Sequence, residues 1–200
     1  MGTFHQNKAD AKGIVKQGCV HSKTAIIIPA RYGSSRLEVK PLIVVEGKPV
    51  IQWVYEKAQQ TKSADIIIVA TDDERIFNVC KDFGAEVEMT STEHKSGSDR
   101  IAEVAERHPE IAYIINLQGD EPLIDPGAIE SIIDTMLNDE SLEYVGLKSK
   151  ITNEEEFYDR NVVKVVVDNN NFAMYFSRSP IPYEFEYGNT YRVMGLYGYT

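Results

Sequence analysis

The sequence predicts an α/β fold in which a doubly wound, mostly parallel, Rossmann-like sheet carries a small antiparallel lobe. Apolar runs of strand length alternate with amphipathic stretches of helix length between residues 24 and 141. The first run, TAIIIPA at 24–30, is continuously apolar, as expected of a strand covered on both faces. From residue 142 onward the alternation gives way to short strand-like arms, which predict the antiparallel lobe.

The strands of the predicted parallel sheet come from four apolar runs. Each run is short and is followed by a polar turn or by a helix signal, and β-branched residues are frequent in most of them. They are residues 24–30, 64–73 with its acidic end, 85–90, and 111–122 with its polar turn.

The helices come from four stretches with apolar periodicity and recognisable end signals. A proline, a serine or an aspartate stands at the start of three of them, and a glycine closes the fourth. They are residues 49–61, 73–84, 98–108 and 125–139. In the first, one helical stripe carries Val50, Ile51, Val54, Tyr55 and Ala58.

The antiparallel lobe is predicted from residues 142–200. Two strand-like arms within 162–179 flank Asp168-Asn169-Asn170-Asn171, and asparagine and aspartate tolerate the left-handed turn geometry that a hairpin needs. A last strand is predicted at 193–200. We expect one domain over residues 24–200, preceded by a polar extension at 1–23 that lies outside the fold and can be disordered.

Charge and composition exclude several classes of function. The 200 residues carry 21 Lys+Arg against 31 Asp+Glu, a formal charge of −10, and nucleic acid or an anionic membrane would need a broad basic face instead. Neither an apolar run of membrane-spanning length nor a signal-peptide pattern is present in this sequence. Cys19 and Cys80, the two cysteines, are expected to be free thiols in a reducing compartment. We therefore expect a cytoplasmic protein.

Polar turns follow three of the predicted strands, at 31–40, 70–73 and 117–122. In doubly wound sheets, ligands bind at the carboxyl ends of the strands. We therefore expect these three turns to line one cleft.

The first turn combines flexibility with positive charge. Gly33, Ser34 and Ser35 allow a tight bend, while Arg31, Arg36 and Lys40 supply cations, so the turn can hold a polyphosphate. The spacing fits neither a Walker loop nor a dinucleotide-binding fingerprint. A solvated surface loop is the alternative.

Acidic residues dominate the other two turns. Asp120 directly follows an apolar strand, and one or two carboxylates are what Mg²⁺ takes before phosphate oxygens and water complete its shell. A turn acid or a helix cap is the alternative for Asp120 and Glu121. Asp72 can touch a nucleoside or cap a helix, and for Asp73 we favour the cap.

Two further motifs carry candidate ligand contacts. Ser96-Gly97-Ser98 precedes a helix, so its N–H groups can meet a base or a phosphate, or it can simply cap the helix. Arg178 lies among aromatic residues and prolines, where it can bind a carboxylate bidentately or form an internal ion pair. Together these parts predict transfer of a phosphoryl-type group from a nucleoside triphosphate with Mg²⁺.

Seven motifs in order resemble one family, the 3-deoxy-manno-octulosonate (Kdo) cytidylyltransferases, or CMP-Kdo synthetases. They are IPARYGSSRL…KPL, GKPVIQWVYEKA, VATDDERI, MTSTEHKSGSDRIAEVA, INLQGDEPLIDP, VKVVVDN…AMYFSRSPIPY and MGLYGYT, and they span residues 25–200. The resemblance implies a nucleotide-diphospho-sugar transferase fold. It also implies the Mg²⁺-dependent reaction of CTP with Kdo to give CMP-Kdo and diphosphate, for lipopolysaccharide or capsule synthesis.

The resemblance also implies roles for individual residues. Residues 24–141 become the nucleotide-binding part and 142–200 the sugar-binding and dimerisation lobe of a homodimer. Asp120 binds Mg²⁺ and, with Arg31 and Lys40, is catalytic. Gln118 and Arg178 bind the sugar acid. The residues implied for the nucleotide are Ala30, Arg31, Arg36, Lys40, Ala70, Asp72, Ser96, Gly97 and Ser98.

Three departures from the family pattern are visible. Leu37-Glu38-Val39-Lys40 stands where the family has Leu-Pro-Gly-Lys, Val193 stands where it has histidine, and the family chain continues beyond Thr200. We therefore expect a C-terminally incomplete domain with weakened activity. The alternatives are a catalytically impaired nucleotide-binding relative, or a cytidylyltransferase for another acidic sugar such as amino-Kdo or a sialic acid.

Overall fold

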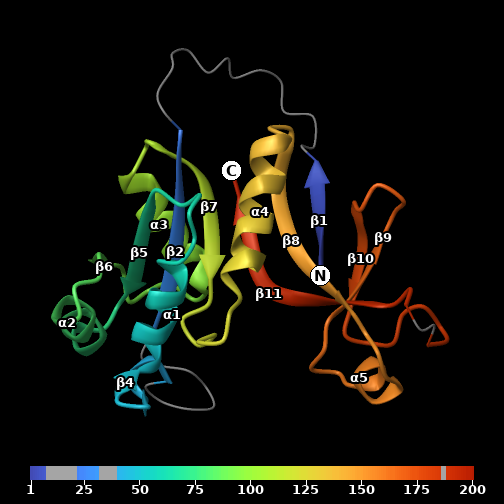
Figure 1. Cartoon of the computed structure of the whole chain (residues 1–200), viewed down its shortest axis with the longest axis horizontal. Helices are drawn as coiled ribbons and strands as arrows, with labels where there is room; N and C mark the ends of the chain where they lie inside the picture. Colours follow the sequence, from blue (N-terminus) through green and yellow to red (C-terminus); the bar gives the residue numbers. More distant parts are fainter. Residues whose placement is uncertain (8–21, 32–39, 186–187) are drawn as a thin grey trace.

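A computed structural model of the chain describes residues 1–7, 22–31, 40–185 and 188–200 (Figure 1). One mixed sheet runs through the molecule in the strand order β1-β8-β11-β7-β2-β5-β6, and the hairpin β9–β10 joins it through β11. No helix in the described part of the chain is long and apolar enough to cross a membrane.

The parallel half of the sheet confirms the predicted α/β fold. Strands β7 (Ile111–Leu117), β2 (Lys23–Ala30), β5 (Ile66–Thr71) and β6 (Val87–Met89) pair in parallel. Helices α1 (Val50–Ala58), α2 (Glu74–Asp82), α3 (Gly97–Arg107) and α4 (Pro126–Asn138) follow the predicted stretches.

Alternating side chains of the central strand β2 build a core on each face of the sheet. Ile26 and Ile28 pack in the cluster that includes buried residues of α1 and α4, whereas Ala25 and Ile27 pack in the cluster that includes α3. All four are fully buried. Burying an isoleucine side chain contributes about 1.5–3 kcal/mol, so the two cores hold the carboxyl end of β2 rigidly in place.

End signals position the helices as the sequence predicts. Asp73 caps α2 by accepting a hydrogen bond from the Arg75 N–H, and Asp125 caps α4 by accepting one from the Gly127 N–H. Gly84 follows α2 with φ of 81°, the left-handed conformation that favours glycine. Burial raises the pKa of the free Cys80 thiol of α2 to about 12, while Cys19 lies outside the described residues.

The antiparallel half is more continuous with the sheet than the sequence predicts. Strands β8 (Leu142–Lys150) and β11 (Tyr191–Tyr199) belong to the main sheet, where β11 lies between β7 and β8. The predicted hairpin is confirmed as β9 (Lys164–Val167) and β10 (Ala173–Ser177), with Asn171 at φ of 67°. The prediction of a lobe beside the sheet is therefore wrong for β8 and β11, because both find partners within the sheet.

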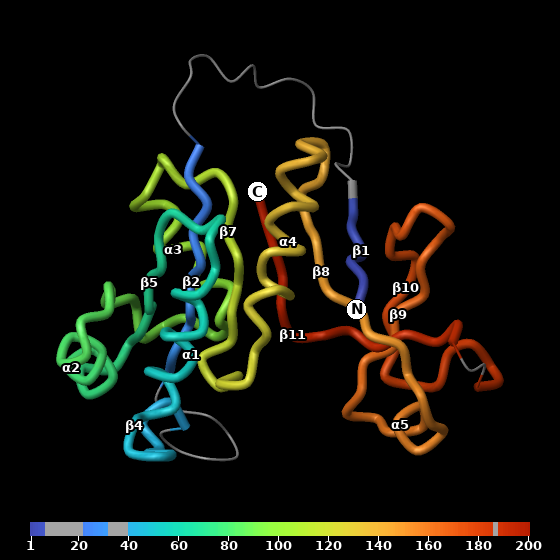
Figure 2. The backbone as a smooth tube through the Cα atoms, in the orientation of Figure 1, coloured from blue at the N-terminus to red at the C-terminus, as the bar shows by residue number. Residues whose placement is uncertain are grey.

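The prediction that residues 1–23 lie outside the fold is wrong at both ends. Residues Gly2–Asn7 form β1, which pairs antiparallel with β8, and β2 begins at Lys23. Figure 2 shows β1 running beside β8 on the side of the β9–β10 hairpin. The stretch has a single large apolar residue, Phe4, so its strand comes from tertiary pairing rather than from a local pattern.

Smaller elements complete the chain. A short 3₁₀ helix, η1 (Lys40–Leu42), leads into a two-stranded ribbon of β3 (Val44–Val45) and β4 (Lys48–Pro49) ahead of α1. Helix α5 (Glu154–Tyr158) lies between β8 and β9, at the lower right of Figure 1.

Candidate active site

A cleft opens at the carboxyl ends of β2 and β7, the edge where the sequence predicts a ligand site. Both strands point to this end of the sheet because they pair in parallel. The residues that line it are Pro29, Ala30, Arg31, Lys40, Pro41, Gly97, Arg100, Gln118, Gly119 and Asp120. Of the three predicted turns, those at 31–40 and 117–122 reach the wall directly.

The cleft brings a cation and a carboxylate together from distant parts of the chain. Lys40, at the start of η1, places its Nζ 3.2 Å from Oδ2 of Asp120, in the turn after β7. Both side chains remain nearly half exposed, so neither is committed to the protein interior. Arg31 donates from Nη1 to the Lys95 carbonyl at 3.3 Å. Arg36, Gly33 to Ser35 and Glu38-Val39 lie outside the described residues.

Two glycines let the walls approach the end of β2. A Cβ added at Gly97 would lie 3.2 Å from Cγ of Pro29, and one added at Gly119 would lie 3.1 Å from the Pro29 carbonyl oxygen. The first turn of α3 and the turn after β7 therefore both close against the same strand end. Both glycines also line the cleft.

The Ser96-Gly97-Ser98 turn combines the predicted ligand contact with the alternative, a helix cap. Ser96 caps α3: its Oγ accepts from the Asp99 N–H, and its own N–H donates to the Asp99 carboxylate, a capping box. Gly97 lines the cleft, as expected of a nucleotide contact, whereas neither serine belongs to the lining.

Arg100 is a cleft residue that sequence reasoning missed. It is 1% exposed, and its guanidinium donates to Asp72 Oδ2 at 2.5 Å and to Thr90 Oγ1. Asp72 is thus tied to the cleft through Arg100, while its Oδ1 is buried without a hydrogen-bond partner among the described residues. The missed signal was a charged residue on the stripe of α3 that also carries buried Ile101 and Val104.

Ala70 does not reach the cleft. It is fully buried in β5, where it packs with Ala25 and Ile68 in the core under α3. The predicted contact of Ala70 with the nucleotide is therefore wrong in this structure, because the residue has no exposed surface.

Gln118 links the cleft to the antiparallel half of the sheet. Its Nε2 donates to Asn116 Oδ1 at 2.8 Å, and Asn116 in turn contacts the Tyr199 hydroxyl at 3.4 Å. A Cβ added at Gly195 of β11 would lie 4.0 Å from Gln118 Cγ and 2.9 Å from Glu121 Oε1. Burial, together with the neighbouring Asp120 carboxylate, raises the pKa of Glu121.

Gly195 also lines a second cavity. The residues that line it are Tyr144, Asn161, Val162, Val163, Phe176, Arg192, Val193, Met194, Gly195 and Tyr197. Arg192 donates from Nη1 to Glu156, and its buried Nε has no hydrogen-bond partner among the described residues. The sequence analysis did not select Arg192, which precedes the MGLYGYT motif in β11.

Arg178 lies near the second cavity rather than in the cleft. Its Nη1 donates to the Arg160 carbonyl at 3.1 Å, and Arg160 directly precedes Asn161 of the cavity lining. Its own carbonyl accepts from Lys164 Nζ at 3.1 Å. The structure therefore separates the two residues predicted to bind the sugar acid, with Gln118 in the cleft and Arg178 on the lobe side.

The cleft suits a cation that arrives with phosphates. Asp120 keeps a half-exposed carboxylate at the mouth, and Mg²⁺ is commonly held by one or two carboxylates plus phosphate oxygens and water. Within the described part of the chain, no group of three or more His, Cys, Asp or Glu side chains could hold a metal by itself. The donor set thus fits a shared ion and not a complete protein cage.

Comparison with known proteins gives one consistent family. Residues 25–199 match the cytidylyltransferase family. A 3-deoxy-manno-octulosonate cytidylyltransferase of Fusobacterium nucleatum is 50% identical over 175 residues, which cover 86% of this chain and 71% of that protein. The enzyme of that name from Thermodesulfovibrio yellowstonii is 45% identical over 192 residues, covering 88% of this chain and 74% of its own.

Solved structures agree with the sequence comparison. The structure of a CMP:2-keto-3-deoxy-manno-octonic acid synthetase complexed with CTP superposes with a TM-score of 0.85 at 44% identity, covering 89% of this chain and 74% of that one. A cytidylyltransferase from Leptospira borgpetersenii gives a TM-score of 0.56 at 26% identity, covering 62% of this chain and 53% of the other.

Proposed function

The chain belongs to the cytidylyltransferase family and, within it, to the CMP-Kdo synthetases, and from that membership we propose that it joins the cytidylyl group of CTP to Kdo. The products are CMP-Kdo and diphosphate. The observation that carries the proposal is the Lys40–Asp120 pair beside Arg31 in the cleft, since two cations and a carboxylate converge there in a chain whose formal charge is −10.

We propose that the cleft holds the triphosphate of CTP. Arg31 and Lys40 offset the phosphate charge, and backbone N–H groups at the first turn of α3 beside Gly97 add donors. Arg100, fixed by Asp72 and Thr90, presents a buried guanidinium to the nucleotide.

Mg²⁺ belongs to the proposal through Asp120. A bound Mg²⁺ would offset charge on the phosphate oxygens, and Asp120 is the described residue that would hold it. The Lys40 ammonium already lies 3.2 Å from that carboxylate, so it orients Asp120 toward the same phosphates.

We propose that the sugar acid binds in the second cavity. Arg192 lines the cavity with a partly exposed side chain, and Arg178 offers an exposed guanidinium on the lobe side, so either can bind a carboxylate. The cavity adjoins the cleft where Gly195 approaches Gln118, which brings a bound sugar next to the nucleotide.

The proposed reaction is an in-line substitution at phosphorus. The oxygen of the sugar's anomeric hydroxyl forms a bond to the α-phosphorus of CTP, and the bond from that phosphorus to the oxygen bridging to the β-phosphate breaks. Diphosphate leaves with the bonding electron pair, and the hydroxyl proton passes to water. Arg31 and Lys40 stabilise the charge that grows on the leaving diphosphate.

A homodimer is part of the proposal. Met174 and Tyr175 of β10 are 68% and 60% exposed, an apolar surface suited to a second copy. Size-exclusion chromatography with light scattering tests it, and a monomer at micromolar concentration contradicts it.

The activity is tested by following diphosphate release with CTP, Mg²⁺ and Kdo, with each omitted in turn. We expect release only when all three are present, and CMP-Kdo as the product by mass spectrometry. Amino-Kdo and a sialic acid belong in the same series, because Val193 gives the second cavity an apolar side chain. No release with any acid, from a chain that circular dichroism shows to be folded, contradicts the proposed function.

A further inference from the structure

Strand β1 lies outside the region that matches the family, yet it is built into the sheet. The family match begins at residue 25, and β1 ends at Asn7. Its residues pair with β8 from Gly2 opposite Lys148 to Asn7 opposite Leu142. An edge strand of this kind covers the backbone N–H and C=O groups that β8 would otherwise leave open.

The Phe4 ring packs over Gly146 of β8, in a space that we call the slot. The side chain is fully buried, and its partner in the ladder is Gly146. A Cβ added at Gly146 would lie 2.4 Å from the Phe4 ring, so the ring occupies the space that a side chain on β8 would need. The ring centroid lies 6.1 Å from that of Tyr144 and 5.4 Å from that of Phe176, the latter edge-on.

His5 ties the same strand to the turn of the β9–β10 hairpin. Its N–H donates to the Asn171 carbonyl at 3.1 Å, and its Nε2 lies 3.1 Å from the Asn170 carbonyl oxygen. Its ring meets Phe172 edge-on at 4.5 Å. On the β8 side, Lys148 donates to the Asn171 side-chain oxygen at 2.6 Å.

Strand β1 therefore bridges two elements that do not pair with each other. It hydrogen-bonds β8 along its length and holds the hairpin at its turn through His5 and at β10 through Phe4 and Phe176. In Figures 1 and 2 it lies between β8 and the hairpin. Two residues that Phe4 touches, Tyr144 and Phe176, also line the second cavity.

We propose that β1 holds Tyr144 and Phe176, the aromatic wall of the second cavity, in place. Phe4 is thereby a positioning residue for the acceptor sugar acid. This inference rests on the proposed function, because it assigns the second cavity to that substrate. Loss of the Phe4 ring frees Tyr144 and Phe176 to move, which weakens binding of the sugar acid but leaves the nucleotide cleft intact.

The first test is a split between the two substrates at a temperature where every variant is folded. We expect Phe4→Ala to raise the KM for the sugar acid about tenfold, with the KM for CTP unchanged within about twofold. Phe4→Leu should restore most of the loss. The matched control is Ile76→Ala in α2, which opens a buried site of the parallel half. Equal changes in both KM values, or none in either, overturn the proposal.

The slot itself supplies a second test. Gly146→Ala alone collides with Phe4 and should raise the sugar-acid KM as Phe4→Ala does. The double variant with Phe4→Ala and Gly146→Ala removes the collision, and it should bind the sugar acid better than Gly146→Ala alone. If the two changes simply add, the ring and the slot do not act together, and the proposal fails.

Hydrogen exchange separates this proposal from the proposed function. Backbone amides of β10 should exchange faster in Phe4→Ala than in the parent protein, while those of β5 keep their rates. This readout needs no turnover, so even a chain that transfers no cytidylyl group tests whether β1 holds the hairpin in place. Unchanged exchange in β10 contradicts it, whatever the activity.

Discussion

Two cations of the cleft in the parallel half and two buried lysines in the antiparallel half are held in different ways. In the parallel half, the buried Arg100 pairs with the Asp72 carboxylate, and Lys40 at the cleft mouth pairs with Asp120. In the antiparallel half, the buried Lys148 and Lys164 have neutral oxygen partners: the Asn171 amide for one and three backbone carbonyls for the other.

This difference separates cations that serve a ligand from cations that serve the fold. A paired cation at an open cleft can exchange its carboxylate for phosphate oxygens, whereas an ammonium that donates to three carbonyls has no donor left. Burial lowers the pKa of both Lys148 and Lys164, which is the cost of holding them without a carboxylate bonded to them. Substitutions in the two halves should therefore separate activity from stability.

The largest effect is expected at Asp120. Asp120→Asn keeps the shape of the side chain but removes the charge that holds Mg²⁺ and orients Lys40, so turnover should fall about 10²–10³-fold. The thermal midpoint should stay unchanged, since the side chain is half exposed. Initial rates of diphosphate release measure the loss.

Asp125→Asn is the matched control for that change. Asp125 lies five residues further along the same segment and caps α4, a role that asparagine fills equally well. Full activity in Asp120→Asn, or an equal loss in both variants, would show that Asp120 is not a cleft ligand.

Lys164 tests the antiparallel half. Lys164→Met removes the ammonium that donates to the carbonyls of Asp159, Val162 and Arg178, at a cost of about 3 kcal/mol in the free energy of unfolding. Urea denaturation measures it. The KM for the sugar acid should rise because Lys164 no longer donates to the Arg178 carbonyl. The KM for CTP should not change.

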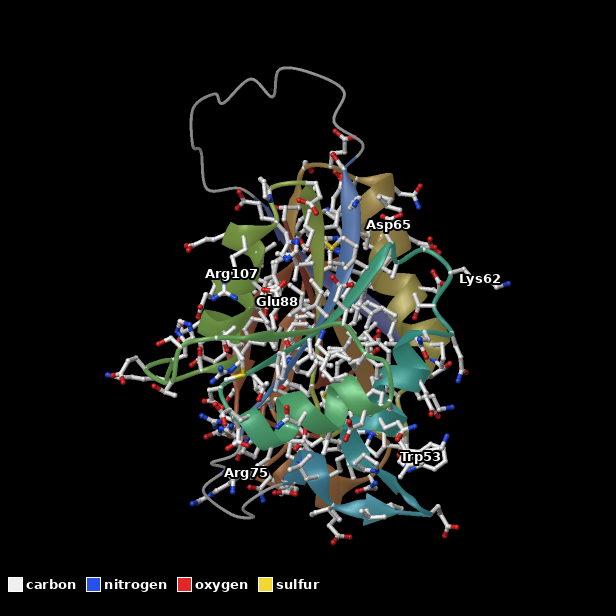
Figure 3. The ribbon with its side chains drawn as sticks, turned by 90° about the vertical axis from the view of Figure 1, so that its left-hand side faces the viewer. Trp53, Lys62, Asp65, Arg75, Glu88 and Arg107 are labelled. Carbon is white, nitrogen blue, oxygen red and sulfur yellow. The ribbon has the colours of Figure 1, made fainter. Side chains whose placement is uncertain are left out.

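The control for Lys164 is Lys62→Met, an exposed lysine that points outward in Figure 3. Its stability should match that of the parent protein. A Lys164 variant that is equally stable would show that the three carbonyl contacts contribute nothing.

Arg100 probes the nucleotide side with a smaller expected effect. Arg100→Lys keeps the charge but loses the fork that reaches Asp72 and Thr90 together, so the KM for CTP should rise about tenfold. The KM for the sugar acid should not change. Calorimetric titration gives the dissociation constant for CTP without turnover, and an unaltered constant excludes Arg100 from the nucleotide site.

A backbone change in the parallel half should cost less still. Gly84→Ala places a Cβ at φ of 81° with no neighbour within 4 Å, so the cost is conformational and about 1 kcal/mol. Activity should stay at the parental level. A stability gain on this substitution would contradict the left-handed assignment at the end of α2.

The smallest effect is a pH dependence at the end of α3. The Glu88 carboxylate raises the pKa of His108, and Glu110 adds to the shift. Arg107, labelled with Glu88 in Figure 3, pairs with the same carboxylate. A raised pKa in the folded state stabilises the protein fully below the ordinary value of 6.5 and loses that contribution as pH rises through the folded value.

His108→Asn should therefore lower the free energy of unfolding at pH 5.5 by less than about 1 kcal/mol and change it little at pH 9. Urea denaturation at the two pH values measures the difference. A larger loss at pH 9 than at pH 5.5 would reverse the sign and contradict the pairing with Glu88.

The parallel half could be predicted from sequence because its signals are local. Continuous apolar runs, capping residues such as Asp73, and Gly84 each specify an element within a few positions. Polar turns at strand ends identify Arg31, Lys40 and Asp120 because parallel strands bring their carboxyl ends to one edge.

The antiparallel half could not be predicted as well because its contacts are distant in sequence. Phe4 finds its slot at Gly146, and nothing within residues 1–7 announces that pairing. Arg100 escaped notice for a related reason, since its partner Asp72 lies on another element. Arg178 was identified by its motif, but its place on the lobe side follows from Lys164 and Arg160.

The most direct test of the division between the halves is a crystal structure of the chain with CTP, Mg²⁺ and an unreactive analogue of the sugar acid. The account predicts the triphosphate between Arg31, Lys40 and Asp120, with the sugar acid in the second cavity beside Gly195. A nucleotide bound in the second cavity, or a sugar acid bound away from Arg178 and Arg192, would contradict it.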